Sequence, residues 1–194
     1  LLFAHFDNLF TTEDSVDQLK QKGVYLFEPP RKVKEFELLQ HSGKPFTKAD
    51  VKGKWSLVFF GFTYCPDVCP MTLSMLNNAL AKIEDPAIRN STQVLMITVD
   101  PARDTPEKLA EYVPYFNKKF IGVTGEFLTI LSLAGNLNAA FTKVPLDDGE
   151  YTMEHSANIF LLNPKGDFQG FFKAPFDAQT FAQKYTRARQ SLAD

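Results

Sequence analysis

The stretch Trp55 to Phe62 (WSLVFFGF) and the segment after it, Thr63 to Ile83 (TYCPDVCPMTLSMLNNALAKI), decide the fold. The first is a nearly continuous apolar run, which is typical of a central strand buried on both faces. The second contains both cysteines and then, from Met71 onward, apolar residues at helical spacing. A buried strand that passes into a helix through a short loop predicts the first crossover unit of an α/β domain.

The chain downstream continues this alternation. Gln93 to Val99 (QVLMITV) predicts a second buried strand, and Thr105-Pro106 fits an N-cap followed by proline at the first helical position, which predicts a helix through about residue 116. The remaining patterns predict a short strand at 121–123, a helix at 126–140, an irregular segment at 143–155 with a turn at 147–149, a strand hairpin at 158–172 and a final helix at 177–192. A parallel pair followed by an antiparallel hairpin resembles the thioredoxin-like α/β sandwich, a central mixed sheet with flanking helices.

The first part of the chain is expected to be peripheral. Residues 11–22 are polar with weak helical spacing, Gly23 stops that pattern, and Glu28-Pro29-Pro30 cannot continue a helix. We therefore predict an N-terminal arm at residues 1–32 and one thioredoxin-like domain at residues 33–194, which begins with a strand-like alternation at 33–39.

Composition narrows the function classes. With 44% hydrophobic residues among 194, the chain can build a real core, and its net charge of −2 does not favour nucleic acid as a partner. No apolar run approaches the length of roughly 18 residues that spans a membrane. The two cysteines stand only four residues apart, so a disulfide between them would close a short loop and stabilise little. Two thiols placed together without a stapling role indicate redox or metal chemistry.

The cysteine pair lies in Cys65-Pro66-Asp67-Val68-Cys69-Pro70, between the buried strand and the helix. Free backbone N–H groups and the positive end of the helix dipole both favour a thiolate there. Two kinds of chemistry follow. The thiols can form a disulfide and act as a redox pair, or both thiolates can bind a soft metal such as copper(I) or zinc. Three residues between the cysteines depart from the two-residue spacing of ordinary thioredoxin-type oxidoreductases.

A metal held by two thiolates needs a third ligand, and the chain has three histidines. His5 lies in the expected arm and His41 in a polar turn, where side chains are normally solvated. His155 follows the expected irregular segment and precedes a strand, so from the residues alone it is either a ligand or an ordinary loop histidine. Imidazole suits copper and zinc alike. Auxiliary thioether candidates are Met71, Met75 and Met153.

Taken together, the cysteine motif, His155 and the segment Asp100-Pro101-Ala102-Arg103-Asp104-Thr105-Pro106 resemble the Sco (SenC) family over roughly residues 33–192. The resemblance implies a thioredoxin-like domain that binds a copper ion, Cu(I) or Cu(II), through Cys65, Cys69 and His155. It also implies a metallochaperone that assists assembly of the copper A centre of cytochrome c oxidase. Asp100 then either steadies the site by hydrogen bonding or belongs to an ordinary turn before the helix.

The partners implied by the resemblance are a copper donor protein and the copper-receiving subunit of cytochrome c oxidase. The implied location is the periplasmic face of the bacterial inner membrane or, alternatively, the mitochondrial intermembrane space, with a membrane tether expected to have been removed from this chain. The alternative function is a thiol–disulfide oxidoreductase that reduces the cysteines of the copper A site, with Cys65 and Cys69 as its redox pair. A more distant third candidate is a peroxidase of the peroxiredoxin type, which only the expected fold supports.

Overall fold

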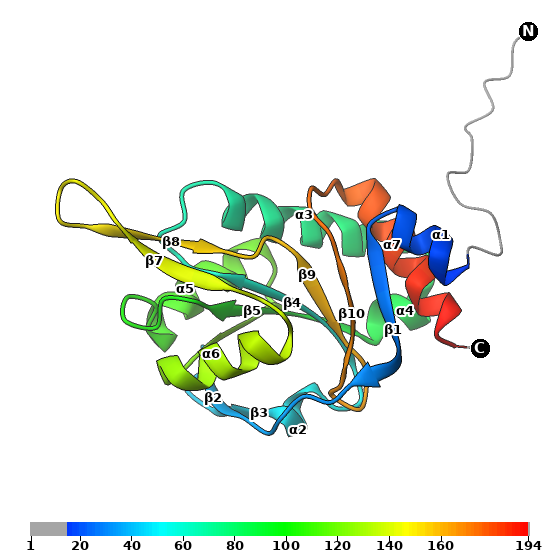
Figure 1. The fold of residues 1–194 in the computed structure, drawn as a ribbon, viewed down its shortest axis with the longest axis horizontal. Coiled ribbons are helices and arrows are strands. Elements are labelled where there is room, and N and C mark those ends of the chain that lie inside the picture. The colour runs from blue at the N-terminus through cyan, green and yellow to red at the C-terminus, as the bar shows by residue number, and fades with distance from the viewer. Residues whose placement is uncertain (1–14, 194) are drawn as a thin grey trace, which may run out of the picture.

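The computed structural model describes residues 15–193. It has a large sheet, a separate hairpin and helices on both faces of the sheet (Figure 1). The strands are β1 (Val24–Arg31), β2 (Glu37–Gln40), β3 (Pro45–Thr47), β4 (Trp55–Gly61), β5 (Thr92–Thr98), β6 (Ile121–Thr124), β7 (Phe141–Pro145), β8 (Tyr151–His155), β9 (Ile159–Leu162) and β10 (Phe168–Phe172). The helices are α1 (Val16–Gln21), α2 (Lys48–Val51), α3 (Val68–Lys82), α4 (Pro86–Asn90), α5 (Pro106–Phe116), α6 (Phe127–Asn136) and α7 (Ala178–Ser191).

The eight-stranded sheet is mixed and has the order β1-β10-β9-β4-β5-β6-β2-β3. Strands β4, β5 and β6 are parallel, while β9 runs antiparallel to β4 and β10 antiparallel to β9. Residues 57–60 of β4 are completely buried, as the continuous apolar run predicts for a strand covered on both faces. The predicted fold class, a mixed central sheet with flanking helices, is confirmed.

The helices form the outer layers. Figure 1 shows α3 and α7 above the sheet and α6 below it, and α3 packs against α7 and α5. Helix α5 begins as predicted, with the Thr105 hydroxyl accepting a hydrogen bond from the Lys108 N–H and Pro106 in the first turn. Because β4 and β5 are parallel neighbours, their carboxyl ends lie at the same edge, and α3 starts from that edge.

The prediction of an irregular segment at residues 143–155 is wrong. This part of the chain forms β7 and β8, an antiparallel hairpin outside the main sheet that projects from the body of the molecule in Figure 1. The expected turn inside it is present, because Gly149 adopts φ 84° and its N–H donates to the Leu146 carbonyl. Polar residues Thr142 and Lys143 interrupt the apolar pattern of β7. Strand β8 does alternate from Tyr151 to His155, a short period-two signal that the expectation of an irregular segment did not use.

The segment read as an arm contains structure that the sequence pattern hid. Residues 24–31 form β1, which pairs with β10 at one edge of the main sheet, and residues 1–14 lie outside the described part of the chain. Pro29 and Pro30 argue against a strand in general, but an edge strand tolerates proline because one side of it needs no donor. The division of the chain into an arm at residues 1–32 and a domain at residues 33–194 stays a prediction. Among residues 15–193, no helix combines the length and the apolar character needed to cross a membrane.

The close fit of β4 beneath the cysteine loop gives a stability prediction. A Cβ added at Gly61 would lie 2.7 Å from Phe59 Cε1 and 3.1 Å from Cys69 Sγ. We expect Gly61→Ala to lower the free energy of unfolding by about 1–3 kcal/mol, because overpacking a tight core forces side chains to shift. Urea denaturation of the reduced protein measures this change.

The matched control is Gly135→Ala in α6, where an added Cβ meets no atom of the described part of the chain within 4 Å. This variant should gain about 0.5–1 kcal/mol, because alanine favours a helix over glycine. Equal stabilities for the two variants would contradict the tight packing at Gly61.

Candidate metal centre

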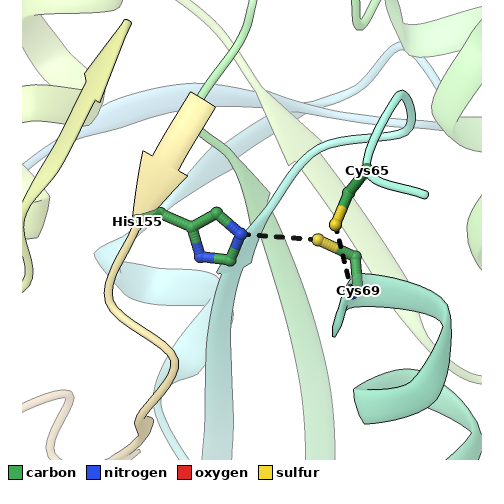
Figure 2. A group of neighbouring side chains, drawn as sticks. All are labelled: Cys65, Cys69 and His155. Atoms are coloured by element: carbon green, nitrogen blue, oxygen red, sulfur yellow. Dashed lines mark hydrogen bonds between the residues drawn. The ribbon is translucent and has the colours of Figure 1, made fainter. Parts of the chain in front are cut away.

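The cysteine loop connects β4 to α3. Cys65 lies in the loop and is half-buried, whereas Cys69 lies in the first turn of α3 and is completely buried. A hydrogen bond of 3.2 Å from the Cys65 N–H to the Phe62 carbonyl closes a turn before the helix. The four-residue step and this turn bring both sulfurs to the same side of the loop (Figure 2).

The two thiols differ in acidity. The Cys69 side chain and its backbone N–H, which lies 3.3 Å from Cys65 Sγ, both donate to that sulfur. The hydrogen bond from the Cys69 side chain is the main cause that lowers the pKa of Cys65 to about 4, with His155 contributing further. The same hydrogen bond, together with burial, raises the pKa of Cys69 far above that of an ordinary thiol. The reduced site therefore holds one thiolate and one thiol at neutral pH.

His155 is the last residue of β8 and reaches the cysteines from the opposite side (Figure 2). Its Nε2 lies 3.5 Å from Cys69 Sγ, and its Nδ1 lies 3.1 Å from the Ser156 carbonyl. Its ring lies nearly perpendicular to the rings of Phe59 and Phe62, and the distances between ring centroids are 5.7 Å to Phe59 and 5.9 Å to Phe62. A carbonyl oxygen can only accept a hydrogen bond, so Nδ1 would donate to the Ser156 carbonyl when Nε2 offers its lone pair to a metal ion.

The three residues form a compact donor set. One ligand atom from each of Cys65, Cys69 and His155 lies within 4.8 Å of the other two. Ligand atoms that share one metal ion at about 2.0–2.3 Å each are at most about 4.6 Å apart, so the set needs little rearrangement to share an ion. Two sulfurs and one imidazole suit a soft or borderline ion such as Cu(I) or Zn(II) and do not suit Ca²⁺ or Mg²⁺.

Asp104 fixes the start of the cysteine loop, and sequence reasoning gave it no role. Its carboxylate is completely buried and accepts hydrogen bonds from the Thr63 N–H at 3.0 Å, the Thr63 hydroxyl at 2.6 Å and the Thr98 hydroxyl at 2.7 Å. Thr98 ends β5 and Thr63 follows β4. The signal for this contact was available, because polar residues that follow two neighbouring parallel strands meet at the same sheet edge.

Asp100 does more than form a turn. Its carboxylate accepts hydrogen bonds from Arg103 Nε and, at 2.9 Å, from the Tyr151 hydroxyl on β8. The loop of residues 100–104 therefore contacts the cysteine loop through Asp104. Through Asp100 it contacts β8, the strand that carries His155 and is called the histidine strand below. Tyr151 was another residue that sequence reasoning missed, because the segment around it was read as irregular.

The other candidates lie elsewhere or in different surroundings. His41 Nδ1 accepts a hydrogen bond of 2.9 Å from the N–H of Gly122 in β6, and burial lowers the pKa of the His41 ring. His5 lies outside the described residues. Met71 is 64% exposed in the first turns of α3, Met75 is half-buried farther along that helix, and Met153 is buried in β8.

Comparison with known proteins identifies the family, since residues 26–190 match SCO1/SenC. The chain belongs to the SCO1/SenC family. It is 36% identical over 154 residues to the mitochondrial SCO2 homologue of Mus musculus, a match that covers 79% of this chain and 60% of that protein. The chain thus spans about three fifths of this curated relative.

Solved structures of the same family resemble the fold. The copper-bound ScoI of Arabidopsis thaliana has a TM-score of 0.76 and 33% identity, with 81% of this chain and 98% of that chain covered. Copper-bound yeast Sco1 has a TM-score of 0.74 and 31% identity, with 84% and 90% covered. Both structures were therefore determined with the metal that the donor set of this SCO1/SenC chain suits.

The hydrogen bond between the cysteines gives a prediction about thiol reactivity. In the reduced protein, alkylation of Cys65 by iodoacetamide should follow a pH profile with its midpoint near the pKa of about 4. In Cys69→Ala the main donor to Cys65 Sγ is gone, so the midpoint should rise toward the ordinary thiol value of about 8.5. Mass spectrometry of the alkylated peptide measures the rate at each pH.

Cys65→Ala is the companion variant. It removes one cause of the raised Cys69 pKa, but burial still raises that pKa and shields the sulfur, so Cys69 should react far more slowly at neutral pH than Cys65 does in the unaltered protein. An unchanged midpoint in Cys69→Ala would show that the helix terminus, and not the Cys69 side chain, acidifies Cys65.

Proposed function

We propose that this chain is a copper metallochaperone, in which Cys65, Cys69 and His155 hold a copper ion and release it to a protein partner. The observation that carries the proposal is the meeting of two thiols and an imidazole within 4.8 Å of one another. The donors come from a loop, a helix and a separate hairpin, so their meeting is not a by-product of packing within one element. The copper-bound relatives support the same choice of metal.

Unequal burial suggests an order for the transfer. Cys65 and His155 are partly exposed, whereas Cys69 is completely buried. Three ligands leave an open coordination position, which a partner's ligand can enter before a donor's ligand leaves. The accessible Cys65 and His155 would then be exchanged first and the buried Cys69 last, which keeps the ion bound throughout.

The surface beside the site suits a protein partner. Tyr64, Val68 and Met71, which flank the cysteines in sequence, are 52%, 44% and 64% exposed. Exposed apolar side chains grouped around a functional site are typical of protein contacts. We propose as partners a copper donor protein and the copper-receiving subunit of cytochrome c oxidase, for assembly of its copper A centre. The corresponding location is the periplasmic face of a bacterial inner membrane or the mitochondrial intermembrane space.

The acidity of Cys65 supports a second candidate function, thiol–disulfide exchange. The Cys65 thiolate would attack a partner disulfide, forming a mixed disulfide and releasing one partner thiolate. Cys69 would lose its proton and attack Cys65 Sγ, closing the Cys65–Cys69 disulfide and releasing the second partner thiolate. The partner disulfide gains the two electrons that the cysteine pair loses, so the chain would reduce the cysteines of the copper A site.

Removal of His155 tests the copper site. We expect His155→Ala to weaken copper(I) binding by the reduced protein by more than about 10-fold, because losing a ligand should exceed the effect of losing an outer partner. Competition with a chromophoric copper(I) chelator measures the affinity. The control is His41→Ala, which removes a histidine that bonds Gly122 and should leave the affinity unchanged.

Equal affinity of His155→Ala and the unaltered protein would remove His155 from the ligand set. If His155→Ala keeps copper binding but loses the ability to reduce a disulfide in the partner's copper A segment, thiol–disulfide exchange becomes the preferred function.

The unequal pKa values predict how copper binding depends on pH. Near pH 7 Cys65 is already a thiolate, whereas Cys69 is a thiol, so copper(I) binding should release about one proton, from Cys69. The affinity should therefore fall as the pH falls, and more steeply below the Cys65 pKa of about 4, where a second proton must leave. Calorimetry in buffers of different ionisation enthalpy counts the protons. Binding without proton release near neutrality would exclude Cys69 as a thiolate ligand.

A further inference from the structure

The strand that carries His155 is attached to the molecule by few elements. Within residues 15–193, strands β7 and β8 pair only with each other and form a sheet of their own. An isolated two-stranded hairpin is at best marginally stable in water. Its side-chain contacts with the body must therefore determine where His155 lies.

Alternate residues of β8 make these contacts. Tyr151, Met153 and His155 share one face of the strand because side chains alternate along it. His155 meets Phe59 and Phe62 at one end, and Met153 is only 9% exposed in the middle. Tyr151 is the contact at the other end of the strand, and it is polar.

Tyr151 is held at three points by two side chains of one loop. Its hydroxyl donates to Asp100 Oδ1 at 2.9 Å, and its carbonyl accepts from Arg103 Nη1 at 3.0 Å. Its ring centroid lies 3.7 Å from Arg103 Cζ, and Arg103 Nε also donates to Asp100. A planar guanidinium that is bonded and stacked at once is strongly restricted in orientation.

The same guanidinium contacts the cysteine loop. Arg103 Cζ lies 4.6 Å from the ring centroid of Tyr64, the residue directly before Cys65. Arg103 thus lies between a tyrosine beside the first cysteine and a tyrosine on the histidine strand. The loop that holds Arg103 is itself tied to Thr63 through Asp104.

We propose that Tyr151 is a positioning residue for the metal site, and that its contacts with Asp100 and Arg103 hold β8 so that His155 stays opposite the cysteines. The proposal rests on the copper function proposed above. Strand residues rise by about 3.3 Å each, so Tyr151 lies roughly 13 Å along the strand from His155. Release of that end would let the hairpin tilt and would lower the fraction of molecules in which Nε2 faces Cys69 Sγ.

Two substitutions grade the effect. Tyr151→Leu removes the hydroxyl and the ring and should weaken copper(I) binding about 10–100-fold, the range for partners that orient a ligand. Tyr151→Phe keeps the ring over Arg103 and loses only one hydrogen bond, so about a 5-fold loss is expected. Affinities are measured by chelator competition on the reduced chain. Tyr115→Leu, which changes an 85% exposed tyrosine of α5, is the matched control and should bind like the unaltered protein.

A double-mutant cycle separates positioning from general destabilisation. In a His155→Ala background, Tyr151→Leu should cause no further loss of affinity, because Tyr151 acts through the absent imidazole. The copper(II) form adds a spectroscopic readout, since nitrogen hyperfine coupling in its paramagnetic resonance spectrum should weaken in Tyr151→Leu. The same loss of affinity in both backgrounds, or an unchanged affinity and spectrum in Tyr151→Leu, would overturn the proposal.

A metal-free measurement distinguishes this proposal from the proposed function. Amide hydrogen exchange of residues 151–155 in the apo protein should accelerate in Tyr151→Leu and, less, in Tyr151→Phe. Unchanged amide hydrogen exchange would overturn the role of Tyr151 in holding β8, even if the protein binds copper. If the unaltered protein bound no copper, the metallochaperone function would fail, while faster exchange would still support Tyr151 as the residue that holds the strand.

Discussion

The buried carboxylate of Asp104 is the contact on which the arrangement of the site depends. A carboxylate without solvent is costly unless hydrogen bonds satisfy it, and Asp104 accepts three from Thr63 and Thr98. Thr63 belongs to the cysteine loop and Thr98 to the end of β5. The end of β5 and the beginning of the loop after β4 must therefore come together around the Asp104 side chain.

From this point the chain builds outward to all three donors. Thr63 precedes Cys65 by two residues, so fixing its backbone fixes where the loop turns into α3. The loop that contains Asp104 also contains Asp100 and Arg103, which bond to Tyr151 on the histidine strand. One short loop, between β5 and α5, thus contacts both segments that supply sulfur and nitrogen. The cysteines and the histidine are far apart in sequence, but the same loop holds the segments that carry them.

The sequence predicted the parts of this fold that depend on local pattern. The apolar runs at 55–62 and 93–99 indicated buried central strands, and Thr105-Pro106 indicated where α5 begins. The cysteine pair was placed correctly between strand and helix because that signal is also local. The hairpin at 141–155 was missed because β7 lacks a clear alternation and the alternation of β8 covers only five residues. The position of the hairpin depends on contacts of Tyr151 with a loop about 50 residues earlier, which no local pattern indicates. Strand β1 was missed because its prolines are tolerated only at a sheet edge, which the sequence cannot reveal.

The position of His155 is another feature that local sequence pattern does not predict. That position also determines the chemistry of the cysteine site. Pattern alone left it open as ligand or loop residue, because no local spacing connects it to Cys69, which lies 86 residues earlier in the chain. Once it lies beside Cys69, the site is asymmetric: an acidic, partly exposed sulfur, a buried protonated sulfur and an imidazole at the rim. That asymmetry would suit the proposed metal transfer, in which exposed ligands exchange first, and also the proposed disulfide reduction, in which an exposed thiolate attacks and a buried thiol resolves. The two functions use the same difference in burial between Cys65 and Cys69, so the role of the imidazole distinguishes them: in a copper site it is a ligand, whereas in thiol exchange it would assist the sulfurs as an acid–base or electrostatic group.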